Sequence, residues 1–237
     1  MIQYSPAWSH GDLKEVFPNI FFVMGTNITT HDGLELQHSR NMVVVKNANE
    51  LTLINTVRLN EAGLVALNKL GKVTNVVRIG AFHGRDDAFY LDRFSAKLWA
   101  LPGVKHEHHK ITDFELGANQ MPFPNSTLFV FETSIHPEAI IHLDQEGGIL
   151  ITCDSVKNWV NQDPFFSEST AKLYQTLGFF GKASISKIWQ DATQVKENDF
   201  ARLKKLSFNH LISAHGEPLL DEAYDRLMQS IYHEFAV

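Results

Sequence analysis

Val76–Tyr90 has the sequence VVRIGAFHGRDDAFY, and this stretch decides the fold class of the chain. A short β-branched run ends at a glycine, and polar residues follow at once before apolar residues return at helical spacing. We therefore predict a strand, a polar loop and a helix, with Asp86 or Asp87 capping the helix. Capping explains one aspartate, but it leaves His83, Arg85 and a second aspartate in the same loop unexplained. Polar side chains at the end of a buried strand are typical of a functional site.

The overall composition is that of a globular protein with one domain over residues 1–237. Of the 237 residues, 44% are hydrophobic and 20% are charged, which allows the chain to bury a large core. The net charge of -6 disfavours nucleic acid as a partner, because phosphate backbones require a basic face. We recognise no leader and no apolar run long enough to span a bilayer, so we expect a cytoplasmic protein that binds a small molecule and no membrane.

The cysteine and histidine content limits the kinds of metal site. Cys153 is the single cysteine, so an internal disulfide and a thiolate-rich zinc site are excluded. A metal would therefore be held by imidazole and carboxylate groups. Among the twelve histidines, we expect His106, His108 and His109 to lie on a solvated strand, because a flat strand surface does not bring ligands together at one point.

The other segments predict a mixed α+β chain. Asn27–Arg40 is polar and is expected to form a loop or an irregular hairpin. The predicted strands are Ile20–Met24, Met42–Val45, Leu51–Val57, Lys97–Ala100, Val104–Thr112, Leu128–Thr133, Ala139–Leu143, Ile149–Thr152 and His210–Ala214. The predicted helices are Asn60–Leu70, Glu197–Leu206 and Asp221–Phe235. Aromatic residues concentrate between them, and the pairs Phe165-Phe166 and Phe179-Phe180 are expected to line an apolar pocket or a homodimer contact.

Several predicted strands end in a histidine or an aspartate. His83 with Asp87, Asp154, and His215 each follow a strand, and His136 follows another after a short interval. If these strands share a sheet edge, the side chains converge. Imidazoles with carboxylates suit zinc, iron or manganese, and an open coordination position would generate hydroxide near neutral pH.

The order and context of these residues resemble the metallo-β-lactamase fold superfamily, from about Ile20 to the end of the chain. The resemblance implies a four-layer αββα sandwich of two mixed β-sheets with a one- or two-metal site at the strand ends. In that family a His-x-His-x-Asp-His motif follows a strand, then come a lone His, an Asp after a strand and a last His. The positions that resemble these metal ligands are His83, Asp87, His136, Asp154 and His215.

Two positions depart from the family motif. Arg85 stands where the second histidine belongs, and Ala88 stands where the closing histidine belongs. A guanidinium is always charged, so Arg85 puts a positive charge where a cation would sit. The sequence is consistent with one weakly held metal, with a rearranged site that uses Asp86, or with a site in which Arg85 replaces the metal and pairs with Asp87 or Asp154. We therefore expect one ion or none, and zinc, iron or manganese as its identity.

Three functions follow from these residues. The first is a metal-dependent hydrolase of a small ester, lactone, thioester or amide, with Asp87, Asp154 and Arg85 as candidate catalytic residues. The second is a non-catalytic protein that binds an anionic ligand through Arg85, because a guanidinium contacts carboxylate or phosphate with two donors. The third, an iron-dependent oxidoreductase, has the least support, since no flavin-binding or rubredoxin-like segment is present. The fold alone does not decide among them.

Overall fold

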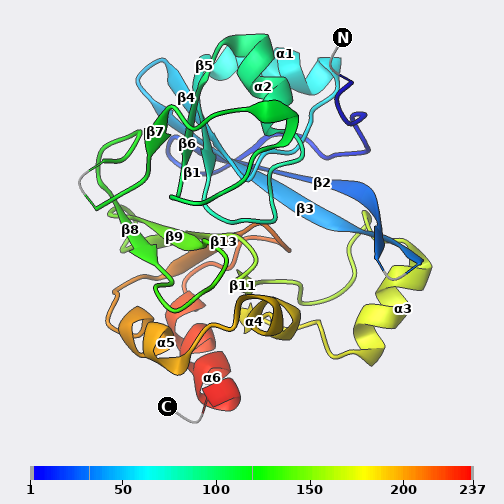
Figure 1. The fold of residues 1–237 in the computed structure, drawn as a ribbon, viewed down its shortest axis with the longest axis vertical. Helices are drawn as coiled ribbons and strands as arrows, with labels where there is room; N and C mark the ends of the chain where they lie inside the picture. The colour runs from blue at the N-terminus through cyan, green and yellow to red at the C-terminus, as the bar shows by residue number, and fades with distance from the viewer. Residues whose placement is uncertain (1–2, 32, 119, 236–237) are drawn as a thin grey trace.

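Two mixed β-sheets lie face to face, and helices cover their outer surfaces (Figure 1). The computed structural model describes residues 3–31, 33–118 and 120–235. The first sheet follows the sequence in the order β1 (Lys14–Phe17), β2 (Ile20–His31), β3 (Leu34–Asn47), β4 (Glu50–Ile54), β5 (Lys72–Arg78), β6 (Lys97–Ala100) and β7 (Phe114–Glu115). Pairing is antiparallel from β1 to β4 and parallel from β4 to β7.

The second sheet has the order β13 (His210–Ser213), β10 (Ile149–Thr152), β9 (Ala139–Leu143) and β8 (Ser126–Val130). Here β10 and β13 are parallel, whereas β9 pairs antiparallel with both of its neighbours. A short third pair joins β11 (Val156–Lys157) to β12 (Ser184–Ile185). The helices are α1 (Glu61–Leu70), α2 (Asp87–Phe94), α3 (Glu168–Thr176), α4 (Lys187–Thr193), α5 (Glu197–Leu203) and α6 (Ala223–Phe235).

Alternation along the strands explains the four layers. Val76 on β5 packs with the core under α1 and α2, whereas its neighbour Val77 packs between the two sheets. Likewise Leu150 on β10 faces the helices at the C-terminal end, and Ile151 faces the other sheet. Because successive strand side chains point to opposite faces, each sheet buries apolar residues on both faces and needs cover on both. The predicted αββα sandwich is confirmed.

The polar segment between the apolar stretches Ile20–Met24 and Met42–Val45 forms a regular hairpin. Pairing between β2 and β3 continues without interruption from Ile20 opposite Val45 to His31 opposite Leu34. The hairpin alternative in our prediction is therefore confirmed, although the pairing is more regular than expected. Backbone hydrogen bonds hold the ladder, so polar side chains do not interrupt it. Several of those polar residues, including Ser39 and Arg40, are buried.

The predicted strand over Val104–Thr112 is wrong. This segment contains a short 3-10 turn, Glu107–His109, in which His108 and His109 have positive φ angles of 53° and 55°. Left-handed backbone conformations are incompatible with a continuous strand. The His106 ring pairs instead with the Thr112 hydroxyl at 2.8 Å.

A side chain caps α1, whereas the cap that we predicted for α2 is absent. The Asn60 side chain accepts a hydrogen bond from the amide of Gly63, which caps α1. Asp86 occupies the cap position of α2, but its side chain makes no capping hydrogen bond. Its carboxylate accepts the backbone N–H of Arg58 and pairs with Arg40, so the aspartate makes a tertiary contact.

Among the described residues, no helix is long and apolar enough to cross a bilayer.

Candidate functional site

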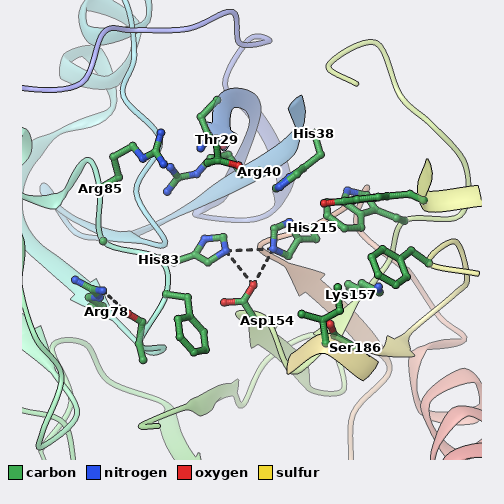
Figure 2. Close-up of a pocket in the computed structure, with 18 of the residues that line it drawn as sticks. Thr29, His38, Arg40, Arg78, His83, Arg85, Asp154, Lys157, Ser186 and His215 are labelled. Atoms are coloured by element: carbon green, nitrogen blue, oxygen red, sulfur yellow. Dashed lines mark hydrogen bonds and ion pairs between the residues drawn. The ribbon is translucent and has the colours of Figure 1, made fainter. Parts of the chain in front are cut away.

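Parallel pairing of β10 with β13 brings two of the predicted site residues together. Thr152 and Ser213 are paired across these strands, and Asp154 and His215 each lie two residues beyond them. Because the strands are parallel, both side chains leave the same edge of the sheet. The loop after β5, in the first sheet, brings His83 to the same point, as Figure 2 shows.

The three side chains meet through one carboxylate oxygen and two ring nitrogens. Asp154 Oδ1 lies 3.1 Å from His83 Nε2 and 3.0 Å from His215 Nε2. The two Nε2 atoms are 3.1 Å apart. Ligand atoms around a tetrahedral zinc ion, at 2.0–2.2 Å from it, are separated by about the same distance. This triad, His83, Asp154 and His215, is the candidate metal site.

Backbone contacts orient the His215 ring. Its Nδ1 lies 3.2 Å from the carbonyl oxygen of Ser39, which has no proton, so Nδ1 is the donor in this contact and Nε2 is the nitrogen that would ligate an ion at the triad. The Asn41 side chain donates to the carbonyl oxygens of Ser213 and Gly216 at 2.9 and 2.7 Å. Ser39 and Asn41 of β3 thus hold the segment around His215 at the end of β13.

The electrostatics of the triad favour a cation. Burial lowers the pKa of His83, which keeps its imidazole neutral and able to ligate. Burial alone would raise the pKa of Asp154, but its hydrogen-bonded contacts with His83 and His215 outweigh burial and hold that pKa well below the usual range. Asp154 is therefore ionised beside two imidazoles.

The donor set fits a single metal ion. Two neutral imidazoles and one carboxylate are ligands for zinc, iron or manganese, and three protein ligands leave a position open for water or substrate. His83 Nδ1 is buried and has no hydrogen-bond partner in the described part of the chain, so only the contacts of Nε2 orient that ring. The triad opens into a cavity of about 480 Å³, which is large enough for a small substrate.

A second acidic group lies behind the triad and supports it. Glu138 is buried, and its two oxygens accept the backbone N–H of Ser155 and the indole N–H of Trp189. The Cys153 thiol lies 3.6 Å from Asp154 Oδ2, and burial raises its pKa well above the usual value. A protonated thiol and a carboxylate with both oxygens in use are poor metal ligands. These groups position Asp154.

Asp87 lies apart from the triad. Its Oδ1 accepts the hydroxyl of Thr56 at 2.6 Å, and its Oδ2 lies 3.9 Å from the guanidinium of Arg78. Burial, only partly offset by Arg78, raises the pKa of Asp87 to about 7. The alternative ligand Asp86 is likewise held by Arg40, at 3.5 Å. The structure therefore does not bring either aspartate to the metal site that the family motif implies.

His136 also lies apart from the triad. Its side chain is exposed, and its ring packs edge-on against Phe82 with the centroids 5.4 Å apart. The sequence places it correctly after β8 and before β9, but the turn directs it outward. We expect His136→Ala to leave the metal content of the purified protein unchanged, whereas His83→Ala lowers it severely, because His83 contributes a nitrogen to the triad and His136 does not. Elemental analysis of both variants makes the comparison, and loss of metal in His136→Ala would contradict it.

The structure contradicts the alternative in which Arg85 pairs with Asp87 or Asp154. Arg85 donates to the carbonyl oxygen of Ile28 at 3.3 Å, and its guanidinium carbon lies 5.6 Å from the ring centroid of Trp8. Arg78, on β5 itself, already neutralises Asp87. Arg85 therefore extends away from the acidic residues, toward the β2–β3 hairpin, and lines the cavity.

Sequence reasoning missed three residues around the triad. His38, Arg40 and Lys157 line the cavity, together with the aromatic Trp159. The Trp159 ring lies 4.4 Å from the ring of His215, and burial lowers the pKa of His38 to about 3, so this histidine is neutral. The position three residues after Asp154 was a usable signal for Lys157. Nothing local in the polar β2–β3 segment marked His38 or Arg40. Of the paired phenylalanines, Phe179 lines the cavity as expected.

Gly216 allows His215 to reach the triad. Its φ angle is +87°, and a Cβ atom there would lie 2.0 Å from the carbonyl oxygen of Asn158. We expect Gly216→Ala to lower the free energy of unfolding by about 3–5 kcal/mol, through backbone strain and steric overlap together. Gly178→Ala is the matched control, because Gly178 has a φ angle of +68° and nothing within 4 Å of the added carbon. Urea denaturation that gave equal losses for both variants would refute the steric explanation.

The four layers and the triad at the strand ends define an αββα protein with a candidate metal centre. Among solved structures, the chain is similar to the DIM-1 metallo-β-lactamase exposed to ceftazidime, at 14% identity over 95% of this chain and 99% of that one, with a TM-score of 0.61. It is similar to the metallo-β-lactamase FIM-1 from Pseudomonas aeruginosa in the mono-zinc form, at 12% identity over 97% and 98%, with a TM-score of 0.61. It is also similar to a metallo-β-lactamase from Erythrobacter litoralis, at 13% identity over 93% and 92%, with a TM-score of 0.58.

These similarities identify the fold. The chain has the metallo-β-lactamase fold over nearly its whole length, as the order of the motifs predicted. No protein-family model matches the sequence, and no curated protein matches it. The activity must therefore be argued from the site.

Proposed function

We propose that this protein is a hydrolase that uses one metal ion, with zinc preferred over iron or manganese, on a small ester, lactone, thioester or amide that carries an anionic group. The observation that carries the proposal is the triad: His83 Nε2, His215 Nε2 and Asp154 Oδ1 lie within 3.1 Å of one another and open into a cavity of about 480 Å³. A bound ion would polarise the scissile carbonyl and lower the pKa of a bound water.

The surrounding residues would hold the triad and shape the cavity. Ser39 orients His215, and the Cys153 thiol and Glu138 lie behind Asp154. The neutral imidazole of His38 and the indole of Trp159 form one wall, packed 5.2 Å apart. This wall excludes water from one side of the site, which strengthens the electrostatic interactions inside it.

Lys157 supports the expectation of an anionic substrate. Its side chain is 5% exposed, and its ammonium nitrogen lies 4.3 Å from the ring centroid of Phe179. Among the described residues, no carboxylate lies within ion-pairing distance of it. Burial lowers its pKa to about 8, so most Lys157 side chains remain charged at neutral pH. A buried cation without a counter-ion at the cavity wall favours a ligand that brings a negative charge.

A second candidate function is binding of an anion without catalysis. Arg85 lines the cavity and makes no ion pair with the described acidic residues, which favours this alternative. In that case the triad would hold a proton rather than a metal ion, since the Nε2 of His83 could donate to Asp154.

Metal analysis combined with a substrate panel tests the proposal. The protein is purified without added metal, analysed for zinc, iron and manganese, and assayed on p-nitrophenyl acetate, a lactone, an acyl thioester and an anilide, with Asp154→Ala as the background. About one metal ion per chain and a chelator-sensitive hydrolysis of one class support the proposal. Absence of metal after soaking, with no hydrolysis and with retained anion binding, supports the second function and overturns the first.

A further inference from the structure

We propose that Arg85, with Arg40 beside it, forms a second anion subsite, so that the ligand of this cavity is a dianion with its charged groups on opposite sides of the triad. The inference rests on the proposed function, because it assigns the substrate class of the same cavity. It adds one specific requirement, which is that the second charge of the ligand is recognised by Arg85.

Arg85 has unused hydrogen-bonding capacity. A guanidinium offers five N–H donors, and within residues 3–31, 33–118 and 120–235 the structure gives Arg85 a single acceptor, the Ile28 carbonyl oxygen at 3.3 Å. Its other described contact is the Trp8 ring, 5.6 Å from the guanidinium carbon. The side chain is half-buried at the cavity wall, so water solvates its positive charge only in part. A planar fork with free donors fits a carboxylate or a phosphate.

Arg40 increases the positive potential at this end of the cavity. It is 5% exposed, donates to the carbonyl oxygen of Thr56 at 2.9 Å, and pairs with Asp86 at 3.5 Å. Figure 2 shows Arg40 and Arg85 on the same side of the triad, and both line the cavity. Two neighbouring like charges repel, and an anion bound to Arg85 would relieve that repulsion.

The charges of the cavity are distributed on two sides. Arg85 and Lys157 lie on opposite sides of the triad, as Figure 2 shows. Arg78 and Arg40, which also line the cavity, are paired with Asp87 and Asp86.

Among the described lining residues, two cations are therefore left without a paired carboxylate, although the protein as a whole has a net charge of -6. Glu107 is the remaining acid that faces Arg85, and it is exposed and beyond ion-pairing distance. Water screens an exposed carboxylate, so Glu107 competes weakly with a ligand.

The chemistry shared by suitable ligands is an acyl compound with a negative group on each side of the scissile bond. A carboxylate or a phosphate satisfies Arg85, and Lys157 accepts either as a point charge. Binding is the direct readout, because dianions without a scissile bond occupy both subsites and need no turnover.

Isothermal titration of the protein as purified, repeated after addition of zinc, tests the dianion requirement. The probes are the dicarboxylates from malonate to pimelate, the phosphonocarboxylates phosphonoacetate and 3-phosphonopropanoate, and the monocarboxylates of equal chain length. We expect at least one dianion to bind about tenfold or more tightly than its matched monoanion, since a charge-assisted hydrogen bond contributes at least that much. Whether the carboxylate or the phosphonate series binds best identifies the group that Arg85 prefers.

Arg85→Gln is expected to remove this preference, leaving monoanion affinity within about twofold, whereas Arg85→Lys restores part of it. Arg93→Gln is the matched control, because Arg93 lies on the outer surface of α2 and pairs with Glu61. Metal content and the far-ultraviolet circular dichroism spectrum verify that each variant is intact.

Dianions that bind no more tightly than monoanions, or a preference that survives Arg85→Gln, would overturn the inference. Failure of the proposed function has a different signature, namely missing metal or missing hydrolysis while the titrations still distinguish dianions from monoanions.

Discussion

Replacing Asp154 with alanine is expected to lower the affinity for a bound metal ion by more than about 100-fold, because changes to outer-shell partners alone cost about 10- to 100-fold. Asp154 is the anionic donor of the triad, and its Oδ1 lies within 3.1 Å of both ring nitrogens. Without it, two neutral imidazoles remain, and the metal-dependent hydrolysis that we propose is lost with the ion. Elemental analysis after dialysis against buffered metal measures the change.

The same variant also has a thermodynamic signature. A ligand that binds only the folded state stabilises it, so at a free metal concentration of 100 times the wild-type dissociation constant the variant lacks about 2 kcal/mol of that stabilisation. Adding chelator should lower the melting temperature of the wild type and leave Asp154→Ala unchanged. Asp144→Ala, at an exposed position in the β9–β10 turn, is the control. Equal metal content in wild type and Asp154→Ala would refute the assignment of the site.

Replacing Arg78 with methionine is expected to lower the free energy of unfolding at pH 8 by about 3–5 kcal/mol, since breaking a buried ion pair leaves an uncompensated charge. Arg78 pairs with Asp87, and it donates to the carbonyl oxygens of Gly80 and Ala81 at 3.1 and 2.5 Å. The loop that carries His83 therefore loses its support together with the ion pair. Urea denaturation of the metal-free protein measures the loss.

The effect of Arg78→Met should depend on pH. The folded pKa of Asp87 is about 7, above the value of about 3.9 for the unfolded chain, so the folded state binds the extra proton between these limits. The stabilisation that this proton gives the folded state is thus fully present below about pH 4 and is lost as the pH rises through about 7. Removing Arg78 raises this pKa further, because the Arg78 charge lowers it in the wild type.

We therefore expect a smaller loss at pH 5, where Asp87 is protonated, than at pH 8. In the double variant Arg78→Met/Asp87→Leu, part of the loss at pH 8 should be recovered, because both charges are removed together. The same loss at both pH values, with no recovery in the double variant, would show that the ion pair is not the cause.

Local patterns predicted much of the fold. The β-branched run at Val76 became β5, the polar stretch became a loop, and the helical spacing became α2. The antiparallel pair β9 and β10 formed around its glycine-containing turn as predicted. Alternation, turn residues and helix periodicity are properties of neighbouring residues, so they can be recognised without knowing the tertiary structure.

The same local patterns failed where a distant partner decided the outcome. Asp86 and Asp87 have the composition of a helix cap, but Arg40 and Arg78 bind their carboxylates. The polar residues of β2 and β3 resemble a loop, but paired backbones make them a long hairpin. That hairpin supplies Ser39 to the triad and Arg40 to the cavity, and no periodicity in the segment indicates either contact.

The sequence by itself determined which elements form, in which order, and that several strands end in histidine or aspartate. Only the tertiary structure decided which of those side chains meet. Asp154 and His215 lie together because β10 and β13 pair in parallel across some sixty residues of chain, and His83 joins them from the other sheet. Asp87 and His136 stand in the same motif order, yet one is held by Arg78 and the other faces outward. Convergence depends on contacts between distant segments, and the residue types at the strand ends do not encode it.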